Sequence, residues 1–215
     1  MAKSALSRRE RGKQERRPNA QRTADTRKAL IEATIQCLCE IGYSRTTTLE
    51  ISRRAAITPG ALQHHFGRKD ELIIATLDKL MVEMAAVLDK AEQVEGAERE
   101  KIDAFVEHLW SEFYGHPRYM AVWEIVVGSR GEPELHPRVA AHRAASVEKC
   151  EQVWCRAFGL KRGTADPRIR ALHFALNYLR GSAILPILPR DEGNSESIKE
   201  SLKTFLAHEF ARHGG

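Results

Sequence analysis

The chain has 215 residues, which is enough for one or two domains with a sizeable core, and 42% of them are hydrophobic. Its apolar runs, such as residues 183–188, are too short to span a bilayer, and none follows the charged N-terminus. Composition therefore excludes a membrane-spanning protein and argues against a secretory signal, and we expect a cytoplasmic protein.

The formal net charge of +5 is unevenly distributed. Residues 1–22 hold eight basic and two acidic side chains, and residues 1–70 hold fifteen and seven, which leaves −3 for residues 71–215. Residues 1–22 also lack hydrophobic periodicity, so we predict a disordered basic arm. Two interpretations remain open for it, a solvated tail and an arm that lies along DNA phosphates or in a minor groove.

The first predicted helix follows the arm and ends at Gly42. Its apolar stripe has spacings of four, three, one and three residues and comprises Leu30, Thr34, Cys37, Leu38 and Ile41. Within this stripe Cys37 is most simply a small core residue. The remaining cysteines, Cys39, Cys150 and Cys155, form no C-x-x-C pair, so no metal site or cofactor is predicted, and a thiol-sensing role for them stays open.

Residues 46–66 indicate two short helices joined by a tight turn. Thr46 or Thr47 is suited to cap the first helix, and Thr58 with Pro59 to start the second, where proline costs nothing. The first helix is expected to carry Leu49, Ile51 and Ala55 on its inner side and Arg53 and Arg54 on its outer side, with Ile57 buried at the corner.

This arrangement is a predicted helix-turn-helix. The front of the second helix must approach a DNA groove closely, and Gly60 and Ala61 are small enough for this. Gln63 and His64 are the predicted reaching side chains. Leu62 and Phe66, one helical turn apart, are predicted to anchor the helix to its own core.

Residues 26–72 resemble the DNA-binding domain of the TetR family of bacterial regulators. The matching positions are Gly42, Tyr43, Thr46, Thr47, Ile51, Ala55, Ile57, Thr58, Gly60, Leu62, His65, Phe66, Lys69 and Leu72. Two positions depart from the family pattern: Ala56 replaces a turn glycine, and Gln63 replaces a tyrosine of the recognition helix. A glutamine there is able to read an adenine edge instead.

The resemblance implies an all-α protein that binds double-stranded DNA. The implied organisation is a helix-turn-helix domain at 23–70, with its motif at 47–66, and a helical effector-binding and dimerisation domain at 71–215. The predicted DNA-contacting residues are Arg45, Thr47, Thr58, Pro59, Gly60, Ala61, Gln63, His64 and Lys69. Among these, Arg45, Thr47 and Lys69 are assigned to the DNA backbone.

Beyond residue 70 the patterns remain helical. A long helix is predicted to start near residues 67–70 and to run to about Val94, far enough to join two domains. Breaks are predicted at 115–117, 128–133, 159–167 and 186–193 and at Pro137. No useful strand-like alternation occurs, which supports an all-α fold.

Two aromatic groups occupy the central region, and core packing and a ligand cavity are both open interpretations of them. In the TetR family this region holds the effector pocket. The residues predicted to line such a pocket are Trp110, Phe113, Tyr114, Met120, Trp123, His173 and Asn177.

The last two helices are predicted to form the interface of a homodimer, because the family pairs its final helices into a four-helix bundle. The first of them has the three-four spacing of a helix–helix seam. The predicted interface residues are Ile169, Leu172, Leu176, Leu179, Ala183, Leu202 and Phe205.

The leading hypothesis is a repressor released from a palindromic operator by a small-molecule effector of unknown identity. A transcriptional activator and an effector-independent architectural DNA binder are the alternatives. An enzyme is not expected, because the sequence contains no P-loop, G-x-S-x-G or H-E-x-x-H motif.

Overall fold

The computed structural model describes residues 19–163, 165–185 and 195–213, which form nine α-helices and no strand. The all-α prediction is confirmed. The helices are α1 (Asn19–Ile41), α2 (Thr48–Ala55), α3 (Pro59–Phe66), α4 (Lys69–Glu92), α5 (Glu98–Leu109), α6 (Tyr119–Gly128), α7 (Leu135–Ala157), α8 (Pro167–Ile184) and α9 (Ser195–His213). Within the described residues, no helix combines the length and apolarity that crossing a membrane requires.

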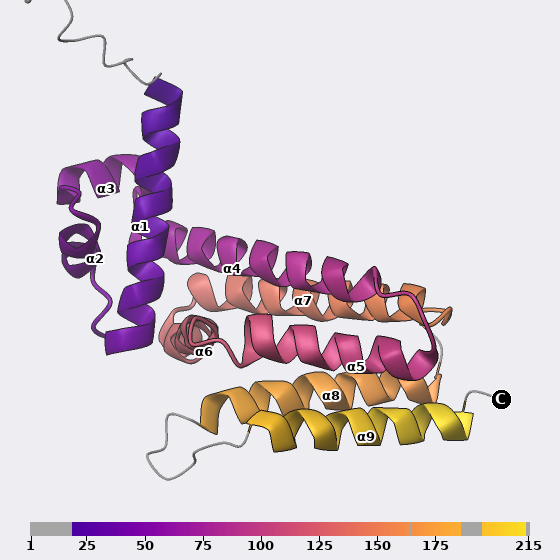
Figure 1. The fold of residues 1–215 in the computed structure, drawn as a ribbon. Helices are drawn as coiled ribbons and strands as arrows, with labels where there is room; N and C mark the ends of the chain where they lie inside the picture. The colour runs from indigo at the N-terminus through magenta and orange to yellow at the C-terminus, as the bar shows by residue number, and fades with distance from the viewer. Residues whose placement is uncertain (1–18, 164, 186–194, 214–215) are drawn as a thin grey trace, which may run out of the picture.

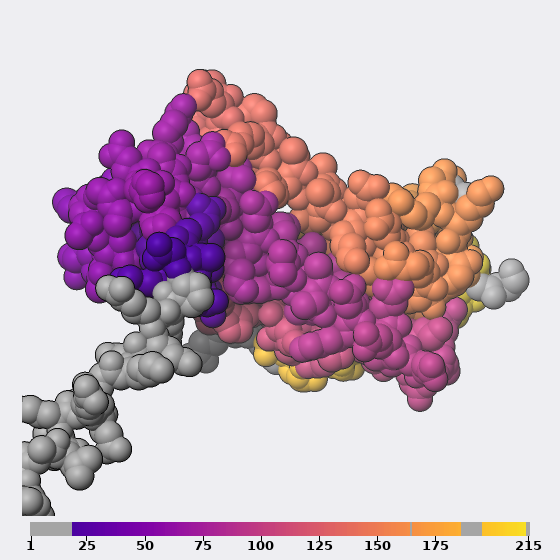
Figure 2. Space-filling model, turned by 90° about the horizontal axis from the view of Figure 1, so that it is seen from above, coloured from indigo at the N-terminus to yellow at the C-terminus, as the bar shows by residue number. Residues whose placement is uncertain are grey.

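The helices form two groups joined by α4. Helices α1, α2 and α3 gather at one end, and α4 leaves this group to lie along α7 and α5 (Figure 1). Helices α8 and α9 lie side by side at the opposite edge, and α6 lies between α1 and the second group (Figure 1). Seen from above, the N-terminal helices form a separate lobe at one end of the molecule (Figure 2).

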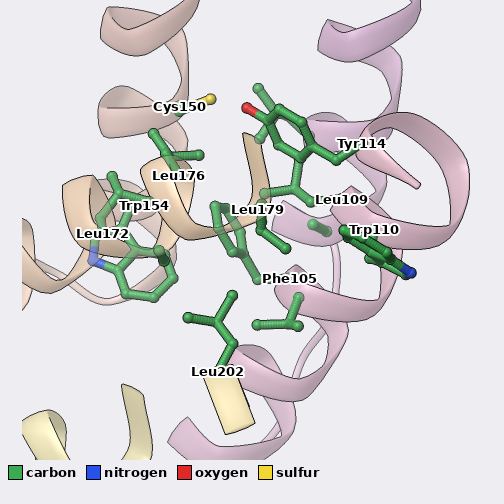
Figure 3. Packing of buried hydrophobic residues seen from close by; sticks show 14 of the residues in the cluster. Phe105, Leu109, Trp110, Tyr114, Cys150, Trp154, Leu172, Leu176, Leu179 and Leu202 are labelled. Carbon is green, nitrogen blue, oxygen red and sulfur yellow. The ribbon is translucent and has the colours of Figure 1, made fainter. Parts of the chain in front are cut away.

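Three buried clusters form the core, one in each group of helices and one between the groups. The N-terminal cluster packs Leu62 and Phe66 of α3 against Leu30 and Cys37 of α1, as predicted. A second cluster joins α1, α4, α6 and α7 at the boundary between the groups. The largest lies among α4, α5, α7, α8 and α9 and surrounds Trp154 (Figure 3). Each helix therefore buries an apolar face, which is the main source of its stability.

The ends of α1 and α7 differ from their predicted positions. Helix α1 begins at Asn19, so residues 19–22, predicted to be disordered, are helical. The rest of the predicted arm lies outside the described residues, as does the predicted break at 186–193. Pro137 was predicted to break the chain, but it lies in the first turn of α7, where its missing N–H costs no helical hydrogen bond.

The predicted seam of α8 faces the protein's own core. Six of the seven predicted interface residues are buried within the single chain: Ile169, Leu172, Leu176, Leu179, Ala183 and Leu202. All of these except Ile169 belong to the largest buried cluster, so they are not available to a second chain. Only Phe205 is partly buried, and it contacts Phe174, whose side chain is 52% exposed. The predicted interface residues on α8 are therefore corrected to core residues.

Candidate nucleic-acid interface and ligand cavity

The two helices of the helix-turn-helix start at capping threonines. The Thr47 hydroxyl accepts the N–H of Glu50 at 3.2 Å, and the Thr58 hydroxyl accepts the N–H of Ala61 at 3.2 Å. Between them Ala56 has φ 53°, a left-handed conformation that favours glycine. The alanine thus adopts the corner conformation that the family's glycine would adopt more easily.

Helix α3 presents a polar outer face. Thr58, Pro59, Gly60, Gln63 and His64 are exposed, and Ala61 is half-buried. An added Cβ at Gly60 would meet no heavy atom of the described residues within 4 Å, so none of them packs on Gly60. The buried residues Leu62 and Phe66 fix the opposite face. This face has the form of a recognition helix.

Arg27 of α1 ties the end of α3 in place. Its guanidinium donates to the carbonyl of His65 at 2.6 Å and lies 4.1 Å from the centre of the Phe66 ring. His65 itself is half-buried. The sequence had offered no signal for this contact, which joins residues 38 positions apart.

Helix α2 differs from its prediction on both faces. Leu49, predicted to point inward, is 69% exposed. Arg54, predicted to point outward, is half-buried and donates to Glu50 at 2.8 Å and also to Glu40. Together Arg53 and Arg54 lower the pKa of Glu50 to about 2, so its carboxylate is ionised at neutral pH. Ile51 is buried as predicted, and Ser52 rather than Leu49 is the other buried residue of this helix.

Two predicted backbone-contacting residues flank the motif. Arg45 is exposed, and its Nε donates to the carbonyl of Ile41 at 2.9 Å. Lys69 is half-buried with its Nζ 4.3 Å from the centre of the Tyr43 ring, and burial lowers its pKa. Lys69 therefore supports the boundary between the helix groups as well as lying near the motif.

Tyr43, two residues after the end of α1, contacts α6. Its backbone N–H donates to the Glu124 carboxylate at 2.7 Å, and its ring packs on Gly128, where an added Cβ would lie 2.1 Å from Cγ of the ring. Burial raises the pKa of the Tyr43 hydroxyl to about 12. Helix α6 thus holds the end of α1 through one charge-assisted hydrogen bond and one close packing contact.

A cavity of about 70 Å³ lies between α4, α6, α7 and α8, next to the π-helical turn at Trp110–Tyr114. Three predicted pocket residues line it, Phe113, Tyr114 and Trp123. The other lining residues are Leu77, Met81, Met84, Tyr119, Val122, Val126, Val139, Arg143, Ser146 and Arg180. The lining is mainly apolar, as ligand sites usually are.

Four predicted pocket residues do not line this cavity. Trp110 is buried in the main core, where its ring packs on Gly115, and Met120 is half-buried. On α8, His173 lies 3.3 Å from the Glu151 carboxylate and Asn177 is exposed. His173 and Asn177 do lie one helical turn apart on α8, but neither side chain lines the cavity.

Two arginines of the cavity were missed by sequence reasoning. Arg180 is half-buried beside the Tyr114 and Tyr119 hydroxyls, and Arg143 lies on α7 near Tyr119. Burial opposes the charge of Arg180, yet Tyr114, Tyr119 and Cys150 leave its pKa raised. Their sequence positions resemble those of surface arginines, so only the packing of α7 and α8 could reveal them.

Comparison with known proteins gives a consistent result for the N-terminal helices. Residues 30–76 match the model of bacterial regulatory proteins of the tetR family. The chain is 24% identical over 204 residues to the HTH-type transcriptional regulator CymR of Pseudomonas putida, covering 92% of this chain and 97% of CymR. It is 29% identical over 97 residues to the regulator BetI of Rhizobium meliloti, but covers only 48% of that protein.

Solved structures share most of the fold. A transcriptional regulator from Rhodococcus sp. RHA1 has a TM-score of 0.69 at 19% identity, covering 86% of this chain and 96% of that one. FadR of Bacillus subtilis in complex with stearoyl-CoA has a TM-score of 0.66 at 14% identity, covering 83% and 96%. Residues 30–76 therefore match the tetR family of bacterial regulatory proteins, and the chain as a whole is similar in sequence and in fold to transcriptional regulators.

Proposed function

We propose that the protein is a homodimeric repressor that binds a palindromic operator and leaves it when a compact ligand enters the cavity. The observation that carries the proposal is the exposed polar face of α3 on a chain that also contains a mainly apolar cavity. No enzymatic role is proposed.

The route from the cavity to the DNA-binding helices runs through α6 and α4. Tyr119, Val122, Trp123 and Val126 of α6 line the cavity, and Glu124 and Gly128 of the same helix hold Tyr43. Helix α4 also lines the cavity and begins at Lys69, directly after the recognition helix. A ligand that shifts α6 or α4 would therefore reorient α3. In a dimer it would change the spacing of the two recognition helices, which must be about 34–36 Å to reach successive major grooves.

The dimer interface is proposed on the outer face of α8 and α9. Phe174 is 52% exposed, stacks on Tyr178 with ring centres 6.3 Å apart, and lies 4.5 Å from Phe205 of α9. Exposed aromatic rings of this kind are typical of protein interfaces. Phe205 belongs both to this face and to the interface predicted from the sequence.

Replacing Phe174 with serine is expected to convert the dimer to a monomer. A central interface aromatic contributes about 2 kcal/mol or more, so the dissociation constant should rise about 30-fold or more. Analytical ultracentrifugation over a dilution series measures this change. Val82→Ser is the matched control, since Val82 is 65% exposed on α4, outside this face. A Phe174→Ser protein that dissociates like wild type would contradict the interface.

Two substitutions at the DNA face are expected to differ in kind. Gln63→Ala should weaken binding about 5- to 160-fold at one or two operator positions, because a bidentate base contact discriminates by about 1–3 kcal/mol. Lys69→Ala should weaken binding to all sequences and lower the salt dependence, because a phosphate contact carries no base information. Fluorescence anisotropy with operator and scrambled duplexes measures both effects.

The matched control for Gln63 is Gln152→Ala on α7, remote from the motif, which should leave both affinities unchanged. If Gln63→Ala and Lys69→Ala each lowered the affinity equally for operator and scrambled DNA, the assignment of Gln63 to a base contact and Lys69 to a phosphate contact would be contradicted.

Selection of bound duplexes from a random library, followed by sequencing, tests the proposed function itself. Recovery of a palindrome with half-sites about one DNA turn apart supports a dimeric sequence-specific regulator. If the selected duplexes share no sequence motif and bind only in a salt-sensitive way, the result would contradict a sequence-specific regulator and favour an architectural DNA binder.

A further inference from the structure

We infer that the cavity binds a compact organic carboxylate, with the carboxylate at Arg180 and the apolar part among the α4 and α6 side chains. This inference rests on the proposed effector-responsive function and adds the chemical class of the ligand.

The first observation is the charge balance of the cavity. Its lining contains Arg143 and Arg180 and no aspartate or glutamate. Among the described residues, no carboxylate lies within ion-pair distance of Arg180, whose neighbours are the Tyr114 and Tyr119 hydroxyls, Cys150 and the Asn177 amide at 3.5 Å. A charge removed from water without a counter-ion is costly, so an anionic ligand would supply the counter-ion that the described residues do not provide.

Most other guanidinium groups on the same elements are used differently. Arg118, next to α6, donates to Glu32 at 2.7 Å and to Glu83 at 3.1 Å, and Arg156 on α7 donates to Glu92. Arg168, on α8 itself, donates to Asp166 at 2.8 Å. Arg180 therefore differs from these arginines in having only neutral neighbours inside an apolar cavity.

The second observation is an unused hydrogen-bond donor. The Trp123 indole nitrogen is buried and has no hydrogen-bond partner among the described residues, although Trp123 lines the cavity. Leaving such a donor unpaired costs about 1–3 kcal/mol, which a ligand oxygen would recover. Arg180, the two tyrosine hydroxyls and this indole N–H all suit a ligand that accepts hydrogen bonds.

The remaining lining residues determine the size and polarity of the rest of the ligand. Leu77, Met81 and Met84 of α4 face Val122 and Val126 of α6 across the cavity. Methionine side chains adapt to different apolar shapes, and the volume of about 70 Å³ favours a single ring or a short chain over a long acyl chain. The tyrosine hydroxyls stay neutral, since burial raises the pKa of Tyr119 to about 12 and raises that of Tyr114 further. They therefore remain able to donate to a carboxylate.

The test measures binding without DNA. Benzoate, 3-phenylpropanoate, hexanoate and octanoate, each paired with its primary amide, are titrated into the full chain by calorimetry and thermal shift. At least one carboxylate is expected to bind and to raise the melting temperature, and its amide to bind about 10- to 100-fold more weakly, as loss of a charged hydrogen-bonded pair predicts.

Two variants locate the carboxylate. Arg180→Met is expected to remove the preference for acid over amide, whereas Arg170→Met, on the exposed side of the same helix, should keep it. Trp123→Phe keeps the ring but removes the donor, and should weaken carboxylate binding about 3- to 10-fold. If Arg180→Met fails to fold, the Trp123→Phe result still decides whether the cavity is the site.

Three outcomes would overturn the inference: no carboxylate binds, acids and amides bind equally, or binding persists unchanged in Arg180→Met and Trp123→Phe. The outcome is separable from that of the proposed function. Carboxylate binding that leaves operator affinity unchanged would support the ligand class and contradict effector-driven release. Release from the operator by neutral amides alone would support effector-driven release and contradict the ligand class.

Discussion

Replacing Trp154 with alanine is expected to lower the free energy of unfolding by about 3–5 kcal/mol, the usual cost of deleting a fully buried tryptophan. The Trp154 ring packs edge-on against Phe105 of α5 at 4.7 Å, and against Phe158 at 4.5 Å and Phe210 of α9 at 5.5 Å. Its indole N–H donates to the carbonyl of Arg168 on α8 at 3.1 Å. One side chain thus connects four helices (Figure 3).

Urea denaturation followed by far-ultraviolet circular dichroism measures this loss. The control is Trp154→Phe, which retains an aromatic ring but loses the bond to Arg168, and should cost only about 1–2 kcal/mol. An alanine variant within about 1 kcal/mol of wild type would show that the helices repack without this contact.

Replacing Gly128 with alanine is expected to destabilise the protein by about 1–3 kcal/mol and to disconnect the cavity from the DNA-binding helices. The added Cβ would lie 2.1 Å from Cγ and 2.5 Å from Cβ of Tyr43, atoms close to the backbone that cannot swing away as the end of a flexible side chain can. Relief requires α6 and α1 to separate. The expected functional result is an operator affinity that no longer responds to a cavity ligand.

Gly131→Ala is the matched control, because an added Cβ there meets nothing within 4 Å. It should change stability by no more than about 0.5 kcal/mol. A double-mutant cycle with Tyr43→Ala adds a second check, since the alanine at Gly128 should cost much less once the ring is absent. If Gly128→Ala and Gly131→Ala behaved alike in stability and ligand response, the α1–α6 contact would have no part in coupling.

Much of the N-terminal region was predictable because its signals are local. A capping threonine, a proline in the first turn and a glycine at a helix end act within a few residues of themselves. Thr47, Thr58 and Gly42 therefore lie where their sequence neighbours predict. Leu62 and Phe66 were also predictable, since two apolar residues four apart share a helix face.

Leu49 and Arg54 show where local reasoning fails. In a helix of eight residues a small rotation exchanges the inner and outer positions, and periodicity over two turns does not determine it. Here the pairing of Arg54 with Glu40 of α1 and the burial of Ile51 decide the rotation. The ion pair and the burial of Ile51 both depend on residues outside the helix itself.

By itself, the sequence determined that the protein is helical, that it carries a helix-turn-helix and that positive charge accompanies it, because each follows from residue type and short-range spacing. Only the tertiary structure decided that the stripe of α8 packs into its own core, that Phe174 is left outside, and that Arg180 lies in the cavity. The physical reason is that an apolar stripe shows only that one face of a helix must be buried. It does not specify whether a neighbouring helix, a ligand or a second chain covers that face.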